Sequence, residues 1–176
     1  MSAHRPETVL LSLGSNIEPD HHLLQAVWNL SQRVEVVAVS QVFETAPVGG
    51  VGPLFLNTAL EIRCVLDPQQ LKFEVLRPVE KELGRERSAD RNAPRSIDVD
   101  ISLFGQQVVE DQEVGLQIPD PEILTRAHVA VPLADLAPNW VHPVTGRRLV
   151  EIAARFAGED LRVFSGLVLW PQSDKF

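Results

Sequence analysis

The stretch Ser96-Ile97-Asp98-Val99-Asp100-Ile101-Ser102-Leu103 alternates polar and apolar residues without a break. This period of two predicts a β-strand with one apolar and one polar face. Asp98 and Asp100 share the polar face, about 6–7 Å apart along the strand. Carboxylates at this spacing can hold one Mg²⁺ between them, or two ions that also bind phosphate oxygens. The stretch therefore predicts both an element of the fold and a candidate metal site.

Five further elements precede this strand and indicate the fold class. Together they give the order strand, helix, strand, strand, helix, strand. This order fits an α+β fold with a ferredoxin-like βαββαβ core, an α/β sandwich with helices on one face of a largely antiparallel sheet. The five elements are a strand over 8–13, a helix from Pro19 to about Leu30, strands over 34–43 and 55–66, and a helix from Pro68 to about Gly84.

Prolines interrupt two of the helical patterns. Pro78 lies inside the second helix, where its ring clashes with the carbonyl of Glu74, so it should kink or restart the helix. Residues 119–138 predict helix in pieces, broken by Pro121 and Pro132. A strand-like piece over 161–170 follows, in a tail over 158–176 to which the sequence assigns no role.

The composition is that of an ordinary globular protein and excludes several classes. Of 176 residues, 44% are apolar and 23% charged, which is enough for a packed core in a single domain over 1–176. The net charge of −8 argues against a general nucleic-acid binder or a polybasic membrane-surface protein. No apolar run approaches the roughly 18 residues of a membrane span.

The single cysteine and residues 1–8 indicate the cellular compartment of the protein. Cys64 cannot form an internal disulfide framework, and its apolar neighbours on a predicted strand indicate a buried, inert thiol. Residues 1–8 lack the basic-then-apolar layout of a signal peptide. We therefore expect a cytoplasmic protein.

Two segments beside the predicted strands have the composition of binding loops. Residues 44–54 are rich in glycine and proline and too long for a hairpin turn, which is typical of a mobile binding loop. Arginines cluster just before the Asp98 strand, where they could bind phosphates and offset the charge that develops in phosphoryl transfer. Alternatively, they pair with nearby glutamates and aspartates on a solvated face. The clustered arginines are Arg85, Arg87, Arg91 and Arg95.

The string Arg91-Asn92-Ala93-Pro94-Arg95-Ser96-Ile97-Asp98-Val99-Asp100-Ile101 resembles the signature of the 6-hydroxymethyl-7,8-dihydropterin pyrophosphokinase family. Other motifs resemble the family in the same order along residues 9–143. They are Gly14-Ser15-Asn16, Phe43 to Gly49, Phe55-Leu56-Asn57, Glu80 with Gly84 to Arg87, and Arg126 with Val131 to Pro138 and His142-Pro143. The family's fold, a ferredoxin-like α/β sandwich, agrees with the order of elements above.

The resemblance implies a reaction of folate biosynthesis. The β,γ-pyrophosphoryl group of ATP would pass to the hydroxymethyl oxygen of the pterin, with release of AMP. Two Mg²⁺ ions would be held across the triphosphate by Asp98 and Asp100. Asp98 also lies where it could take up the substrate's hydroxyl proton, and Arg85 and Arg95 would contact the phosphates during transfer.

The resemblance also implies which residues bind the two small-molecule partners, ATP and the pterin. Asn57 would hydrogen-bond the pterin edge, because an amide offers a donor and an acceptor together. Without the resemblance, Phe55 and Ile101 would be taken for core residues. The other pterin-side positions are Thr45, Val48, Phe55 and His128, and the nucleotide-side positions are Glu80, Arg87, Arg95, Ile101 and Arg126.

Departures from the family pattern leave alternatives open. Asn92 stands where the family usually has Trp, Asp120 where it has His, and His128 where it has Phe. Arg77 and Ser102 also depart from it. The alternatives are a pyrophosphokinase for a different pterin-like alcohol and a non-catalytic pterin- or nucleotide-binding homologue. A ferredoxin-like interaction module, with arginines in surface ion pairs, is the alternative from outside the family.

Overall fold

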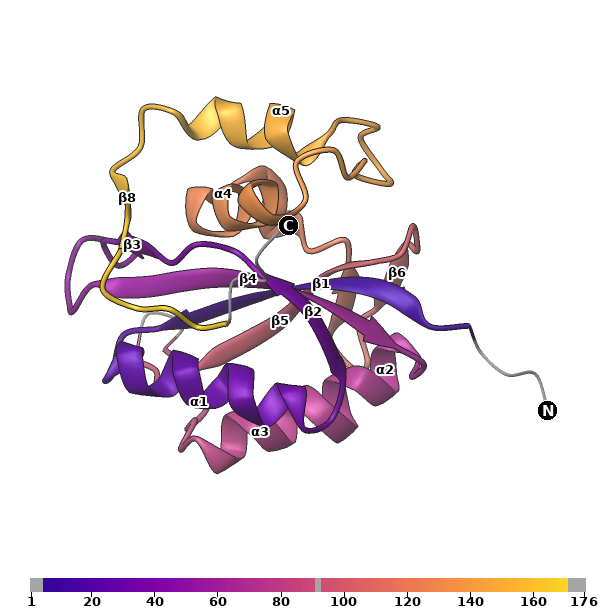
Figure 1. Ribbon diagram of the computed structural model, residues 1–176, viewed down its shortest axis with the longest axis horizontal. Coiled ribbons are helices and arrows are strands. Elements are labelled where there is room, and N and C mark those ends of the chain that lie inside the picture. The colour runs from indigo at the N-terminus through magenta and orange to yellow at the C-terminus, as the bar shows by residue number, and fades with distance from the viewer. Residues whose placement is uncertain (1–4, 91–92, 171–176) are drawn as a thin grey trace, which may run out of the picture.

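The computed structural model describes residues 5–90 and 93–170. Within them, the main sheet has six strands: β1 (Glu7–Ser15), β2 (Glu35–Val39), β3 (Phe43–Thr45), β4 (Phe55–Cys64), β5 (Asp98–Phe104) and β8 (Leu161–Val163). The strand order is β5-β1-β4-β3-β8, with β2 also paired to β4 (Figure 1). Every pairing in this sheet is antiparallel. Along the chain, the order of strands and helices up to β5 agrees with the predicted ferredoxin-like core.

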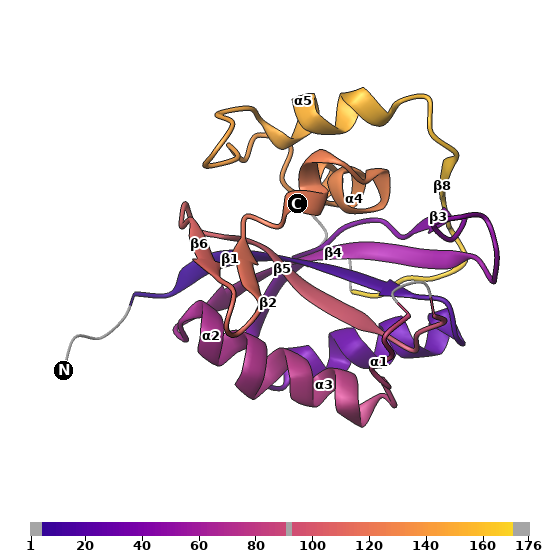
Figure 2. The same cartoon turned by 180° about the vertical axis from the view of Figure 1, so that it is seen from behind.

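Helices cover both faces of this sheet. They are α1 (Pro19–Ser31), α2 (Pro68–Gln70), α3 (Arg77–Glu82), α4 (Ala127–Leu136) and α5 (Leu149–Ala153). Figures 1 and 2 show α1, α2 and α3 on one face, α4 on the other, and α5 outside α4. The expectation of helices on one face, made for the βαββαβ core, is confirmed, and the segment after the core adds helices on the other face. No helix in the described ranges is long and apolar enough to cross a membrane.

Strand β1 supplies apolar residues to both layers of the core. Val9, Leu11 and Leu13 pack in the cluster beneath the sheet, with the buried residues of α1 and the α2–α3 helix. Leu10 points the other way, into a second cluster with α4 and α5. Helices α4 and α5 bury this second apolar layer. Cys64 is buried, and burial raises the pKa of its thiol, as expected for an inert cysteine.

The α2–α3 helix shows how the chain accommodates Pro78. Asp67 caps its start, with its carboxylate accepting the N–H of Gln70 at 2.8 Å. The central part, Leu71–Leu76, is π-helix, in which the N–H of Arg77 donates to the carbonyl of Lys72. The α-helix then restarts as α3, with Pro78 in its first turn. The chain passes without a break from this π-helix into α3, so the disturbance expected at Pro78 takes the form of a π-helical turn before it.

The segment after β5 differs from the prediction at Pro132. A hairpin of β6 (Val109–Asp111) and β7 (Leu116–Ile118) comes first, and a 3-10 helix then begins at Pro121. Pro132 lies inside α4 without breaking it. Because Pro132 is buried among the apolar residues of α4, packing outweighs the lost backbone hydrogen bond.

Two strands also differ from the prediction. The strand expected over 34–43 is split into β2 and β3, since Ser40 leaves the strand and its hydroxyl accepts the N–H of Ala59 at 2.9 Å. Within the tail, only β8 is a strand among the described residues. It pairs with β3, so the segment without an assigned role completes the sheet.

Candidate active site

A cavity of about 240 Å³ opens on the α4 side of the sheet. It brings together most of the predicted site residues, although they come from distant parts of the chain. They are Thr45, Val48, Phe55, Asn57, Arg95, Asp98, Asp100, Arg126 and His128. The remaining lining residues are Ser12, Leu13, Gly14, Ala46, Pro47, Asp120, Glu122 and Val129. The sequence analysis named none of this second group as site residues, although Gly14, Ala46 and Pro47 lay in family-like motifs and Asp120 was a departure from the family pattern.

The sheet register aligns three of these positions in one row. Gly14 on β1 is the cross-strand partner of Asp98 on β5 and of Asn57 on β4. Directly opposed residues lie on the same face of a sheet, and strands are spaced about 4.7–4.9 Å apart. Asp98 and Asn57 therefore face the cavity from positions about 9–10 Å apart. Between them lies the bare backbone of Gly14.

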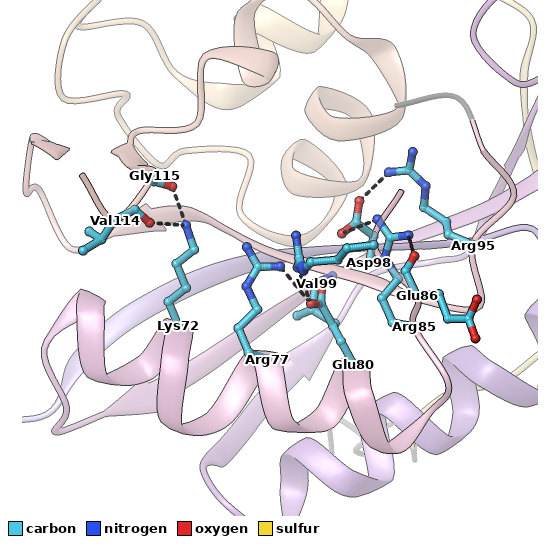
Figure 3. Close-up of polar contacts among 11 residues, drawn as sticks. Lys72, Arg77, Glu80, Arg85, Glu86, Arg95, Asp98, Val99, Val114 and Gly115 are labelled. Atoms are coloured by element: carbon cyan, nitrogen blue, oxygen red, sulfur yellow. Dashed lines mark hydrogen bonds and ion pairs between the residues drawn. The ribbon is translucent and has the colours of Figure 1, made fainter. Parts of the chain in front are cut away.

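Arginines flank the carboxylate of Asp98 (Figure 3). Arg95 Nη1 donates to Asp98 Oδ2 at 2.6 Å, and Arg85 Nη2 lies 4.0 Å from Asp98 Oδ1. The side chains of both arginines are more than four-fifths buried. Arg85 lies outside the lining of the cavity, whereas Arg95 is part of it. Two positive charges therefore lie beside Asp98. The resemblance assigns to this carboxylate both metal binding and uptake of the substrate's proton.

The cavity is rich in carboxylates. Asp100 has an accessible side chain, yet desolvation by the surrounding protein, followed by the charge of Asp98, raises its pKa well above the usual range. Burial also raises the pKa of Asp120 to about 6. With Glu122, four carboxylates face the two lining arginines, Arg95 and Arg126. A polyphosphate would enter this site only with cations that offset the combined negative charge.

Glu80 lies outside the cavity, beside β5. Its side chain is 2% exposed, and Oε1 accepts the backbone N–H of Val99 at 2.9 Å. Oε2 accepts from Arg77 Nη1 at 3.0 Å and from Arg87 Nη2 at 2.8 Å. Burial raises the pKa of Glu80 to about 7, although the bond from Val99 and the charge of Arg77 oppose this. Figure 3 shows Glu80 joining α3 to the strand that carries both aspartates.

Two other nucleotide-side positions also lie away from the lining. The side chain of Arg87 is 53% exposed and paired with Glu80. Ile101 is 7% exposed, with its side chain in the core cluster beneath the sheet. A nucleotide could therefore reach Ile101 only through its backbone. Arg91 and Asn92 lie outside the described residues.

The pterin-side residues form a connected group. Asn57 Nδ2 donates to Thr45 Oγ1 at 2.9 Å and to the carbonyl of Phe43 at 3.4 Å. The guanidinium carbon of Arg95 lies 5.9 Å from the centroid of the Phe55 ring, within the range of a cation–π contact. Burial lowers the pKa of His128, so its half-buried ring is neutral at pH 7. The cavity thus has apolar and amide contacts at one end and carboxylates at the other.

A sequence model of the family described as 7,8-dihydro-6-hydroxymethylpterin-pyrophosphokinase (HPPK) matches residues 10–138. The chain is a member of the HPPK family. The matched segment includes every predicted site residue and ends before α5 and β8. The expected family is thus confirmed.

Curated relatives agree with this assignment to the HPPK family. Several are named 2-amino-4-hydroxy-6-hydroxymethyldihydropteridine pyrophosphokinase. That of Bacillus subtilis is 41% identical over 130 residues, covering 72% of this chain and 75% of its own. That of Pseudomonas aeruginosa is 34% identical over 164 residues, covering 91% of this chain and 98% of its own.

Other relatives are longer proteins. The folic acid synthesis protein fol1 of Pneumocystis carinii is 35% identical over 159 residues, and the match spans 89% of this chain and 21% of fol1. The crystal structure of Plasmodium falciparum HPPK-DHPS A437G with SDX-DHP aligns with a TM-score of 0.69 at 14% identity. That alignment covers 89% of this chain and 46% of the Plasmodium chain. The likeness confirms the fold class.

Proposed function

We propose that this chain transfers the β,γ-pyrophosphoryl group of ATP to 6-hydroxymethyl-7,8-dihydropterin, releasing AMP. The observation that carries the proposal is the row of Asp98, Gly14 and Asn57 across three strands. It places an amide suited to the edge of a flat heterocycle and a carboxylate suited to phosphate chemistry in one cavity. Membership of the HPPK family supports the choice of substrates.

The residues present fit Mg²⁺, which prefers oxygen ligands and usually keeps bound water and phosphate among them. Asp98 and Asp100 would hold the ions, with phosphate oxygens and water as further ligands. Among residues 5–90 and 93–170, no group of three or more His, Cys, Asp or Glu side chains is arranged to hold an ion by itself. We therefore infer that Mg²⁺ enters with ATP. When bound, Mg²⁺ would reduce the charge repulsion that opposes attack on the triphosphate.

The proposed transfer step uses Asp98 and Arg95. The hydroxymethyl oxygen forms a bond to the β-phosphorus of ATP. The bond from that phosphorus to the oxygen bridging to the α-phosphorus breaks, and its electron pair leaves with AMP. Asp98 accepts the hydroxyl proton. Arg95, held against Asp98 at 2.6 Å, lies ready to stabilise the charge that develops on the phosphates.

The deciding experiment is AMP release from Mg-ATP, with and without 6-hydroxymethyl-7,8-dihydropterin. AMP that appears only with the pterin supports the proposal. A folded protein that binds Mg-ATP and releases no AMP would be a non-catalytic homologue. Release with another pterin-like alcohol alone would identify a different substrate. The cytoplasmic location stays a prediction.

A further inference from the structure

Gly14 is the central residue of the row that joins the two ends of the cavity. It lies on β1, a strand paired on both sides, and lines the cavity together with Asn57 and Asp98. Its φ is not among the positive values found at other glycines of the chain. Any residue could therefore adopt its backbone conformation. Because glycine weakens a strand by roughly 0.5–1 kcal/mol relative to alanine, a reason other than backbone shape is needed for it.

The surroundings of Gly14 supply that reason. A Cβ atom at this position would lie 3.2 Å from Asn57 Oδ1 and 3.9 Å from Cδ1 of the Phe55 ring. The first distance is shorter than an ordinary van der Waals contact, so the amide of Asn57 would have to shift. Because Gly14 lines the cavity, a Cβ here would both press on Asn57 and cover part of the cavity floor.

The amide of Asn57 is fixed in one orientation. The carbonyl of Phe43 can only accept, so the group facing it must be the Asn57 nitrogen. The two hydrogens of this nitrogen go to Phe43 and Thr45. Oδ1 is left on the side of Gly14 as an acceptor, and it calls for an N–H donor on the ligand. The edge of a pterin ring offers such donors.

We propose that Gly14 is a specificity-determining position, whose missing side chain opens the floor of the cavity between Asn57 and Asp98. A flat ring can then lie over the bare backbone, with its N–H edge at Asn57 and its hydroxymethyl oxygen at Asp98. This inference rests on the proposed function. Because Gly14 has no side chain, the ring-binding end of the cavity stays open to the phosphate-binding end.

The test compares Gly14→Ala with wild type and with Gly158→Ala. Gly158 is the matched control, because its φ is not positive and a Cβ there would meet nothing within 4 Å. For each protein we would measure the Tm, the Kd of a non-hydrolysable Mg-ATP analogue, the Kd of 6-hydroxymethyl-7,8-dihydropterin with that analogue bound, and AMP release. Wild-type AMP release tests the proposed function separately.

We expect Gly14→Ala to weaken pterin binding at least tenfold, a change of about 1.4 kcal/mol. Its Tm should be no lower than that of wild type and its affinity for the analogue should be unchanged, and Gly158→Ala should bind both ligands as wild type does. An unchanged pterin Kd in Gly14→Ala would overturn the inference. So would a loss of analogue and pterin binding in step with a lower Tm, since that would show a structural role. Neither result would affect pterin-dependent AMP release by wild type.

Discussion

The carboxylate of Glu80 accepts a hydrogen bond from the backbone N–H of Val99, the residue between Asp98 and Asp100, at 2.9 Å. Through this contact α3 holds the strand that presents both aspartates. The same carboxylate is paired with Arg77 and is almost fully buried. Glu80 is thus a positioning residue for the two aspartates.

Replacing Glu80 should therefore reduce the stability of the fold. Glu80→Ala leaves the Val99 N–H without its partner and Arg77 without its counter-charge, and we expect the free energy of unfolding to fall by about 3 kcal/mol. Urea unfolding measures this change. Glu82→Ala is the control, because its partner is Arg33 and its side chain is 47% exposed. The control should lose less than about 1 kcal/mol. Equal losses would contradict the anchoring role of Glu80.

Asp98→Ala and Asp100→Ala should each reduce AMP release by about 10²-fold or more, because each removes one of two carboxylates proposed to hold Mg²⁺. The fold should persist, since neither side chain is part of the apolar core. Circular dichroism and Tm would check this. Asp160→Ala, on an exposed segment, is the matched control. Unchanged turnover in either site variant would remove the metal assignment.

Arg95→Ala should reduce kcat more than it raises KM for either substrate. Arg95 contacts Asp98 and lies over Phe55, but its proposed role is to meet charge that develops only during transfer. Steady-state kinetics with each substrate varied in turn would separate the two effects. A proportionate rise in KM with unchanged kcat would instead show uniform binding.

His142 should make the fold sensitive to acid. It is 2% exposed, its Nδ1 accepts from the N–H groups of Val144 and Thr145, and burial lowers its pKa. The unfolded chain, with an ordinary histidine pKa of about 6.5, therefore takes up the proton first. Stability from the neutral ring is present above about pH 6.5 and is lost as the pH falls below it.

The variant His142→Asn isolates this effect. The amide oxygen of Asn can replace Nδ1 as the acceptor but does not titrate. Urea unfolding at pH 7.5 and 5.5 should show wild type losing stability relative to His142→Asn at the lower pH. The comparison removes the opposite contribution of buried carboxylates such as Asp120, which both proteins share. A constant difference between them would contradict the prediction.

The sequence predicted the parts of the fold that follow from local patterns. The alternation around Val99 and the helix start at Pro68 each depend on neighbours within a few residues, and both are confirmed. Residues 119–138 were expected to be helical in pieces, but the sequence did not predict that α4 continues through Pro132. Its tolerance depends on burial against residues far away in the chain.

The candidate site was likewise predictable where it depends on local motifs and not where it depends on distant contacts. The motifs containing Asp98 and Asn57 pointed to residues that do line the cavity, and the register of β1 places them in one row. The placement of Glu80 could not be predicted, because charge alone does not reveal that a strand N–H lies beside it. The part played by Gly14 depends equally on cross-strand partners that a single sequence does not identify.

The pairing of β8 with β3 bears on the order in which the protein is made. Synthesis runs from the N-terminus, so the strand that carries Thr45 emerges long before residues 161–163, which pair with it. Until those residues leave the ribosome, one edge of β3 has exposed backbone hydrogen-bonding groups. The wall of the cavity beside Asn57 is thus among the last parts of the molecule to be completed.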